Sequence, residues 1–122
     1  MKKILIAEDE MDMAEIMKER LSMAGFDVVL AYDGYQGVQM AHKEKPDLMI
    51  LDIMMPAGDG LSVLKRLRMS EDTKDMPIIV LTATRKEEYK KKAFEMGVFD
   101  FMYKPCDSAL LINKINEALS GK

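Results

Sequence analysis

Short apolar runs alternate with longer segments of mixed polarity along the whole chain. Each run is four or five residues long. Most runs are rich in branched or aromatic side chains, which is typical of strands buried on both faces of a sheet. They occupy residues 4–7, 28–31, 48–51, 78–81 and 99–103. The hydrophobic pattern therefore predicts five short strands.

The segments between these runs show the three- or four-residue spacing of amphipathic helices. A first helix is expected to be capped by Gly25, and further helices are expected over residues 33–44, 59–69 and 86–96, the last stopping at Gly97. A fifth helix is expected after an N-cap at Asp107 or Ser108. The side chains predicted to face inward are Met13, Ile16, Met17, Leu21 and Ala24 in the first helix, Tyr89, Ala93 and Met96 in the fourth, and Leu111, Ile112, Ile115, Ala118 and Leu119 in the fifth.

Strands that alternate with helices indicate an α/β fold, in which right-handed crossovers connect parallel strands and helices cover both faces of the sheet. The length of 122 residues fits a single domain, expected here over residues 1–122. In open parallel sheets, binding and catalytic sites form outside the carboxyl ends of the strands. The residues that follow the predicted strands are therefore the candidates for function.

Composition and charge indicate which binding partners and which cellular compartment to expect. The net charge is −3, which gives no electrostatic reason to expect direct binding to nucleic acid or to a membrane. A single cysteine fits a reducing compartment. The apolar run near the N-terminus is too short for a signal peptide, and no run approaches the roughly 20 apolar residues that cross a bilayer. We expect a soluble cytoplasmic protein.

Asp52 ends an otherwise apolar run, and burying a carboxylate without a partner is costly. Glu8 and Asp9 follow the first predicted strand, so the three acidic side chains should converge at one edge of the sheet. Two carboxylates about 4 Å apart repel by roughly 4 kcal/mol at an effective dielectric constant near 20. A hard divalent cation such as Mg²⁺ suits such a group of oxygen ligands. Thr82 and Lys104 add a hydroxyl and a positive charge, so Asp52 is equipped to form an aspartyl phosphate.

The chain resembles the receiver domain of two-component response regulators, of the chemotaxis-regulator-like type, because five separated motifs match that family in the same order. The resemblance covers nearly the whole chain, from Lys3 to about Leu119. It implies a flavodoxin-like fold of three α/β/α layers, with five helices and a five-stranded parallel sheet in the order 2-1-3-4-5. The motifs are Glu8-Asp9, Asp52 with Met55-Pro56, Asp59-Gly60, Thr82-Ala83 and Lys104-Pro105.

The resemblance implies a role for each acidic residue. Asp52 would be the phosphoacceptor, which takes a phosphoryl group from a phosphohistidine of a sensor histidine kinase or phosphotransfer protein. Asp9, Asp52 and the backbone carbonyl of Met54 would bind Mg²⁺, for which Mn²⁺ can substitute, and Glu8 would reach the metal through water. Met54 and Thr84 match positions that flank the path of hydrolytic water in this family, and apolar Met54 would orient water poorly and prolong the phosphorylated state.

The resemblance also implies a switch. Thr82 and Lys104 would bond phosphoryl oxygens, and Phe101, where many relatives have tyrosine, would turn inward as Thr82 moves. The Lys104-Pro105 peptide bond would be cis. The face made by the fourth helix, the fifth strand and the fifth helix would then change shape and bind a downstream protein target. Such a domain is not an enzyme in the usual sense, because it catalyses only its own phosphorylation and slow dephosphorylation.

Three alternatives follow from the same residues. An aspartyl-phosphate hydrolase would need a second acid in a D-x-D pattern, which Asp52-Ile53-Met54 lacks. A flavin-binding flavodoxin would need a phosphate-binding loop after the first strand, where this chain has acidic residues. A degenerate receiver would bind partners without phosphorylation, which the intact acidic trio argues against.

Overall fold

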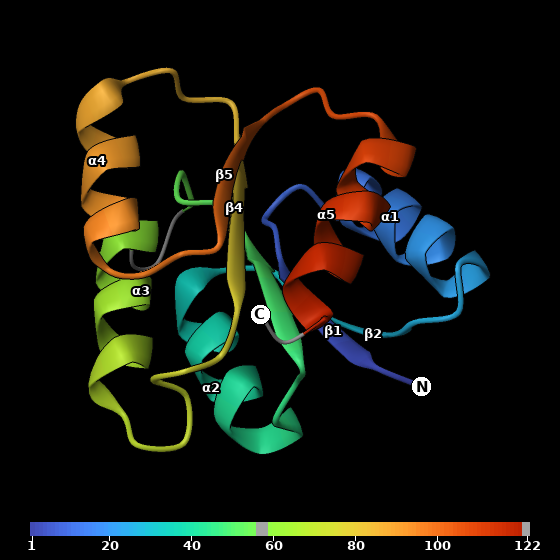
Figure 1. Ribbon diagram of the computed structural model, residues 1–122, viewed down its shortest axis with the longest axis horizontal. Coiled ribbons are helices and arrows are strands. Elements are labelled where there is room, and N and C mark those ends of the chain that lie inside the picture. Colours follow the sequence, from blue (N-terminus) through green and yellow to red (C-terminus); the bar gives the residue numbers. More distant parts are fainter. Residues whose placement is uncertain (56–58, 121–122) are drawn as a thin grey trace.

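The five strands form one parallel sheet in the order β2-β1-β3-β4-β5 in the computed structural model of the chain (Figure 1). The structure describes residues 1–55 and 59–120. The strands are β1 (Lys3–Ala7), β2 (Asp27–Ala31), β3 (Leu48–Leu51), β4 (Ile78–Thr82) and β5 (Asp100–Tyr103), and the helices are α1 (Met11–Met23), α2 (Gly34–Glu44), α3 (Gly60–Met69), α4 (Glu87–Glu95) and α5 (Ser108–Leu119). The predicted flavodoxin-like α/β fold is therefore confirmed.

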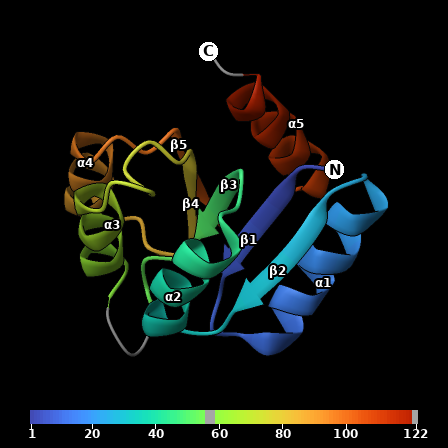
Figure 2. The same cartoon turned by 90° about the horizontal axis from the view of Figure 1, so that it is seen from below.

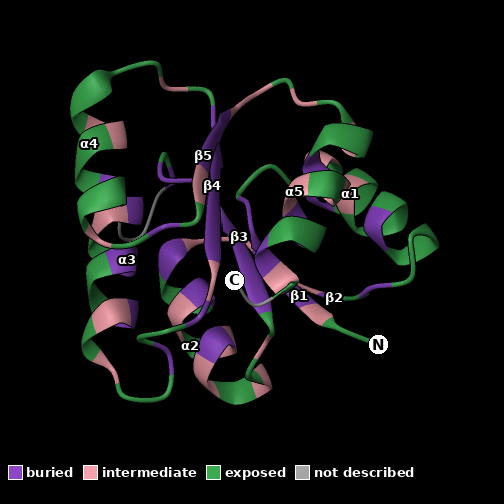
Figure 3. Cartoon of the chain, viewed as in Figure 1, coloured by how far each residue is buried: buried purple, intermediate pink, exposed green. Residues whose placement is uncertain are grey.

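The helices cover both faces of the sheet and give the molecule three layers (Figure 2). Helices α2, α3 and α4 lie on one face, and α1 and α5 lie on the other. Alternate strand positions supply the two cores: Leu5 and Met49 face the first group of helices, whereas Ile4 and Ile50 face the second. Because both faces are covered, β1, β3 and β4 are buried almost throughout (Figure 3).

The inner face of α1 differs from the predicted one. Ala14 and Leu21 are buried, and Met17 packs against the same core. Ile16 is 51% exposed, and Ala24 is an exposed C-cap residue. The prediction was wrong for Ile16 and Ala24 because apolar residues occupy several faces of this methionine-rich helix, so their spacing does not identify a single inner face.

The ends of several elements differ from the predicted ones by one residue. β5 begins at Asp100, so Phe99 precedes the strand and is 40% exposed. Asp33, Asp59 and Lys86 are N-caps of α2, α3 and α4 and not their first helical residues. The carboxylates of Asp33 and Asp59 accept hydrogen bonds from backbone amides in the first turn of their helices, which is the role of an N-cap residue.

Parallel pairing brings the carboxyl ends of the strands to one edge of the sheet. Ala7, the last residue of β1, is in register with Leu51, the last residue of β3. Thr82, the last residue of β4, is in register with Tyr103 at the end of β5. Residues that follow these positions must therefore lie near one another. Within the described residues, no helix is both long and apolar enough to cross a membrane.

Candidate functional site

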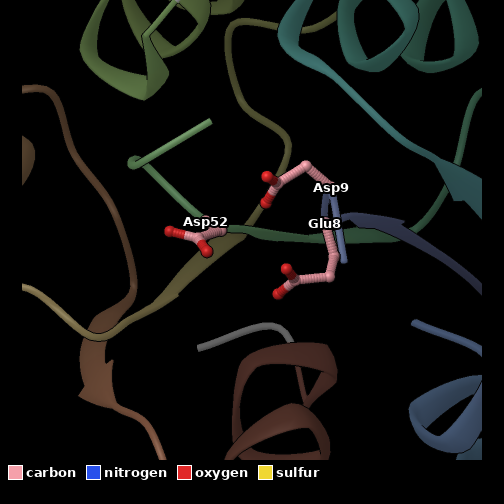
Figure 4. Close-up of side chains that lie close together, drawn as sticks. All are labelled: Glu8, Asp9 and Asp52. Atoms are coloured by element: carbon pink, nitrogen blue, oxygen red, sulfur yellow. The ribbon is translucent and has the colours of Figure 1, made fainter. Parts of the chain in front are cut away.

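Three carboxylates converge where β1 and β3 end. One oxygen from each of Glu8, Asp9 and Asp52 lies within 4.8 Å of the other two, and the three side chains lie close together (Figure 4). Glu8 and Asp52 are buried, with only 2% and 5% of their surface exposed, whereas Asp9 is exposed. The cluster therefore reaches from the interior of the sheet edge to the protein surface.

The ammonium group of Lys104 lies between the two buried carboxylates. Its Nζ is 2.6 Å from Glu8 Oε1 and 2.8 Å from Asp52 Oδ2, and its side chain is 15% exposed. The Lys104 backbone amide donates to the Thr82 carbonyl at 2.9 Å, which holds the start of the lysine side chain at the end of β4. Because each buried charge has a hydrogen-bonded partner, neither carboxylate is an isolated charge in the interior.

Burial and pairing act in opposite directions on the pKa values of this pair. Burial raises the pKa of the Glu8 carboxyl, although hydrogen bonds from Lys104 and from the Glu10 amide lower it. Burial lowers the pKa of the Lys104 ammonium, but its hydrogen bonds to Asp52 and Glu8 outweigh burial and leave that pKa raised. The raised pKa of Glu8 favours a protonated carboxyl, whereas the raised pKa of Lys104 favours a charged ammonium paired with carboxylates. Contacts to two carboxylates favour the charged ammonium, so Lys104 is a cation at neutral pH.

The segment after Asp52 is held by two backbone interactions. The Met54 amide donates to Asp52 Oδ1 at 2.9 Å, and the Gly60 amide donates to the Ile53 carbonyl at 2.9 Å. A Cβ atom on Gly60 would lie 2.1 Å from the Ile53 Cα atom, so only glycine permits this approach. The Asp59-Gly60 motif therefore has a steric basis. Pro56, from the Met55-Pro56 motif, lies outside the described residues.

The switch residues lie at the same edge of the sheet. Thr82 is fully buried, and its Oγ1 accepts a long hydrogen bond from the Thr84 amide at 3.4 Å. Phe101 is 5% exposed and packs in the core cluster on the α4 side of the sheet, so its ring already points inward in this conformation. The peptide bond between Lys104 and Pro105 is cis.

The donor set suits a hard divalent cation. Three carboxylates and one ammonium group leave a formal charge of −2 when all four groups are ionised. Every metal-ligand atom that the three acidic side chains offer is an oxygen, which matches the preference of Mg²⁺ and Mn²⁺. Asp9, Asp52 and the Met54 carbonyl would hold the ion, with Glu8 acting through water. The backbone of Met54 lies beside Asp52, as this arrangement requires.

Sequence reasoning missed two residues beside the site, Arg85 and Tyr103. The guanidinium carbon of Arg85 lies 4.3 Å from the centroid of the Tyr103 ring, whose edge-on neighbour is Phe101 at 5.6 Å. An Nη2 group of Arg85 also donates to the Lys104 carbonyl at 3.3 Å. Neither spacing nor hydrophobic pattern signals this contact, because it joins a loop to a strand that lies elsewhere in the chain.

Comparisons with known proteins agree with the geometry. A family model described as the response regulator receiver domain matches residues 4–116. The DNA-binding dual master transcriptional regulator RpaA of Synechocystis sp. is 37% identical over 119 residues, which are 98% of this chain and 49% of that protein. The chain thus spans about half the length of this curated relative.

Solved structures show the same similarity. The receiver domain of response regulator 1452 from Francisella is 30% identical, with a TM-score of 0.89 over 98% of each chain. A CheY-like receiver domain protein from Methanospirillum hungatei is 25% identical, with a TM-score of 0.93 over 98% of this chain and 94% of that one. The similarity therefore extends over the whole sheet and both helical layers.

Proposed function

This chain belongs to the family of response regulator receiver domains, and on that premise we propose that Asp52 accepts a phosphoryl group from a phosphohistidine. Domains of this family interact with histidine kinases or phosphotransfer proteins, which would be the donors. The observation that supports the proposal best is the environment of Asp52. Its Oδ2 contacts Lys104, its Oδ1 accepts the Met54 amide, and two further carboxylates adjoin it.

In the proposed reaction, a carboxylate oxygen of Asp52 bonds to phosphorus while the bond from phosphorus to the histidine nitrogen breaks. The imidazole keeps the electron pair of that bond and takes up a proton. Lys104 already contacts Asp52 at 2.8 Å, so its charge lies where the phosphoryl oxygens arrive. The Thr82 hydroxyl, at the end of the neighbouring strand, donates to another phosphoryl oxygen. Asp9, Asp52 and the Met54 carbonyl would hold Mg²⁺, which would supply further neutralisation of the phosphoryl charge.

We further propose that phosphorylation changes the face made by α4, β5 and α5. β5 is one of the two edge strands of the sheet and lies between these two helices (Figure 1). Thr82 is the last residue of β4, and Lys104 directly follows β5. Both side chains would bond the phosphoryl group. Their movement would therefore reach this face, where a downstream protein binds the two conformations unequally. The chain itself catalyses only its own phosphorylation and slow dephosphorylation.

The test is incubation with Mg²⁺ and acetyl phosphate, followed by mass spectrometry of the intact protein. We expect a mass gain of one phosphoryl group, which is lost in Asp52→Ala and when the metal is chelated. Asp75→Ala is the matched control, because Asp75 is exposed and precedes the amino end of β4, whereas the site lies at the carboxyl ends of the strands. An unmodified native protein, or equal modification of the Asp52→Ala variant, would favour a receiver that binds partners without phosphorylation.

A further inference from the structure

Arg85, in the loop between β4 and α4, contacts the end of β5 through its side chain. Arg85 lies in this loop and is exposed, yet its guanidinium group is held from two directions. It stacks over the Tyr103 ring at 4.3 Å, and it donates to the Lys104 carbonyl at 3.3 Å. Arginine over a tyrosine face is a favourable cation–π arrangement within about 6 Å. The loop conformation therefore depends on a contact with β5.

Three hydrogen bonds connect Thr82, the loop after it and Lys104, beside the proposed phosphorylation site. On one side, the Lys104 amide donates to the Thr82 carbonyl at 2.9 Å. On the other, the Lys104 carbonyl accepts from Arg85. Between them, the Thr84 amide donates to the Thr82 hydroxyl at 3.4 Å. Movement of the loop would therefore change the contacts of Lys104, whose ammonium group contacts Asp52.

We infer that Arg85 and Tyr103 are positioning residues that hold the Thr82 hydroxyl and the Lys104 ammonium in register for the phosphoryl group. Within the described residues, the Asp52 side chain is hydrogen-bonded to Lys104 and to the Met54 amide, and not to Arg85 or Tyr103, so these two act through Thr82 and Lys104. Groups that are already in place when charge arrives need no reorganisation, which speeds the reaction. This inference rests on the proposed phosphorylation of Asp52 and extends it to residues outside the acidic cluster.

The kinetic test compares phosphorylation rates with acetyl phosphate at saturating Mg²⁺. We expect Arg85→Ala and Tyr103→Leu each to slow phosphorylation by about two- to fivefold, the factor that matches a cation–π contact at an exposed site. The double variant should be no slower than the slower single variant, because both substitutions remove the same stacking contact between Arg85 and Tyr103. Tyr103→Phe should retain the native rate, since it keeps the ring face. Lys86→Ala is the control for lost positive charge, because Lys86 is the exposed neighbour of Arg85.

A second measurement does not depend on phosphorylation. In unphosphorylated protein without metal, the amide NMR signals of Ala83, Thr84 and Lys104 should shift in Arg85→Ala and Tyr103→Leu but remain in place in Lys86→Ala. Additive rate effects, a rate loss in Tyr103→Phe equal to that in Tyr103→Leu, or unchanged amide signals would each overturn the inference. A native protein that accepts no phosphoryl group, with the amide shifts observed, would instead overturn the proposed function and leave the structural contact established.

Discussion

Replacing Lys104 with methionine tests whether the acidic cluster depends on its internal cation. The ammonium contacts Glu8 at 2.6 Å and Asp52 at 2.8 Å, and all three side chains are mostly buried. Removing one partner of a buried ion pair costs about 3–5 kcal/mol, because an uncompensated charge remains in the interior. At roughly 4 °C per kcal/mol for a domain of this size, the midpoint of thermal unfolding should fall by about 12–20 °C.

Lys114→Met is the matched control. Lys114 also contacts two carboxylates, Asp100 at 3.1 Å and Glu117 at 3.6 Å, but these side chains are 27% to 61% exposed. Ion pairs of this kind contribute about 0–1 kcal/mol, because water stabilises the separated charges. Both variants lose one ammonium group and keep a similar side-chain length, so their difference in unfolding free energy measures the effect of burial at the site.

The loss in Lys104→Met should also depend on pH and on metal. Burial already raises the pKa of Glu8, and Lys104 opposes that shift together with the Glu10 amide, so the variant should raise the pKa further. A carboxyl whose folded pKa exceeds its unfolded value stabilises the fold below the unfolded pKa, and this stability is lost as pH rises through the folded pKa. Calorimetry should therefore show a smaller deficit in acid, and added Mg²⁺ should reduce the deficit at neutral pH. Equal deficits in Lys104→Met and Lys114→Met, or a deficit independent of pH, would refute the reasoning.

Three further predictions concern Gly60 and Met54, which lie near Asp52, and Arg68 at the end of α3. Gly60→Ala should lower the free energy of unfolding by about 3 kcal/mol or more, because the new Cβ would meet the Ile53 backbone at 2.1 Å; urea titration measures it. Arg68→Ala should cost about 2–4 kcal/mol in the same assay, since its guanidinium donates to five backbone carbonyls, whereas exposed Arg66→Ala should be near neutral. Met54→Asn should speed loss of the phosphoryl group, because the side chain is 50% exposed beside Asp52 and an amide can orient water; an equal or slower decay would contradict this.

The sheet could be predicted from sequence because its signals are local. Runs of apolar residues at the strand positions leave little choice of conformation, and strands buried on both faces need no alternation to be recognised. The strand order itself came from resemblance, since period and run length do not specify which strands are neighbours. The face of α1 was mispredicted at Ile16 because exposed methionines weaken the periodicity that usually separates an inner face from an outer one.

The site was predictable to the extent that it consists of residues at strand ends. The parallel register alone brings Glu8, Asp52 and Lys104 to one edge, so their convergence follows from topology. Arg85 and Tyr103 could not be predicted in this way, because their contact depends on the conformation of the loop after Thr82. The inward position of Phe101 likewise depends on packing against α4, which the spacing of residues does not report.

The site holds three carboxylates together by placing one in contact with water and pairing the other two with a buried cation. Asp9 remains in contact with water, whereas Glu8 and Asp52 share the ammonium of Lys104. The same ammonium lies where a phosphoryl group on Asp52 would place its oxygens. Lys104 therefore stabilises the fold before phosphorylation and would neutralise charge after it. Because one group serves both states, substitutions of Lys104 should impair stability and phosphorylation together, whereas a substitution at exposed Asp9 should separate the two effects.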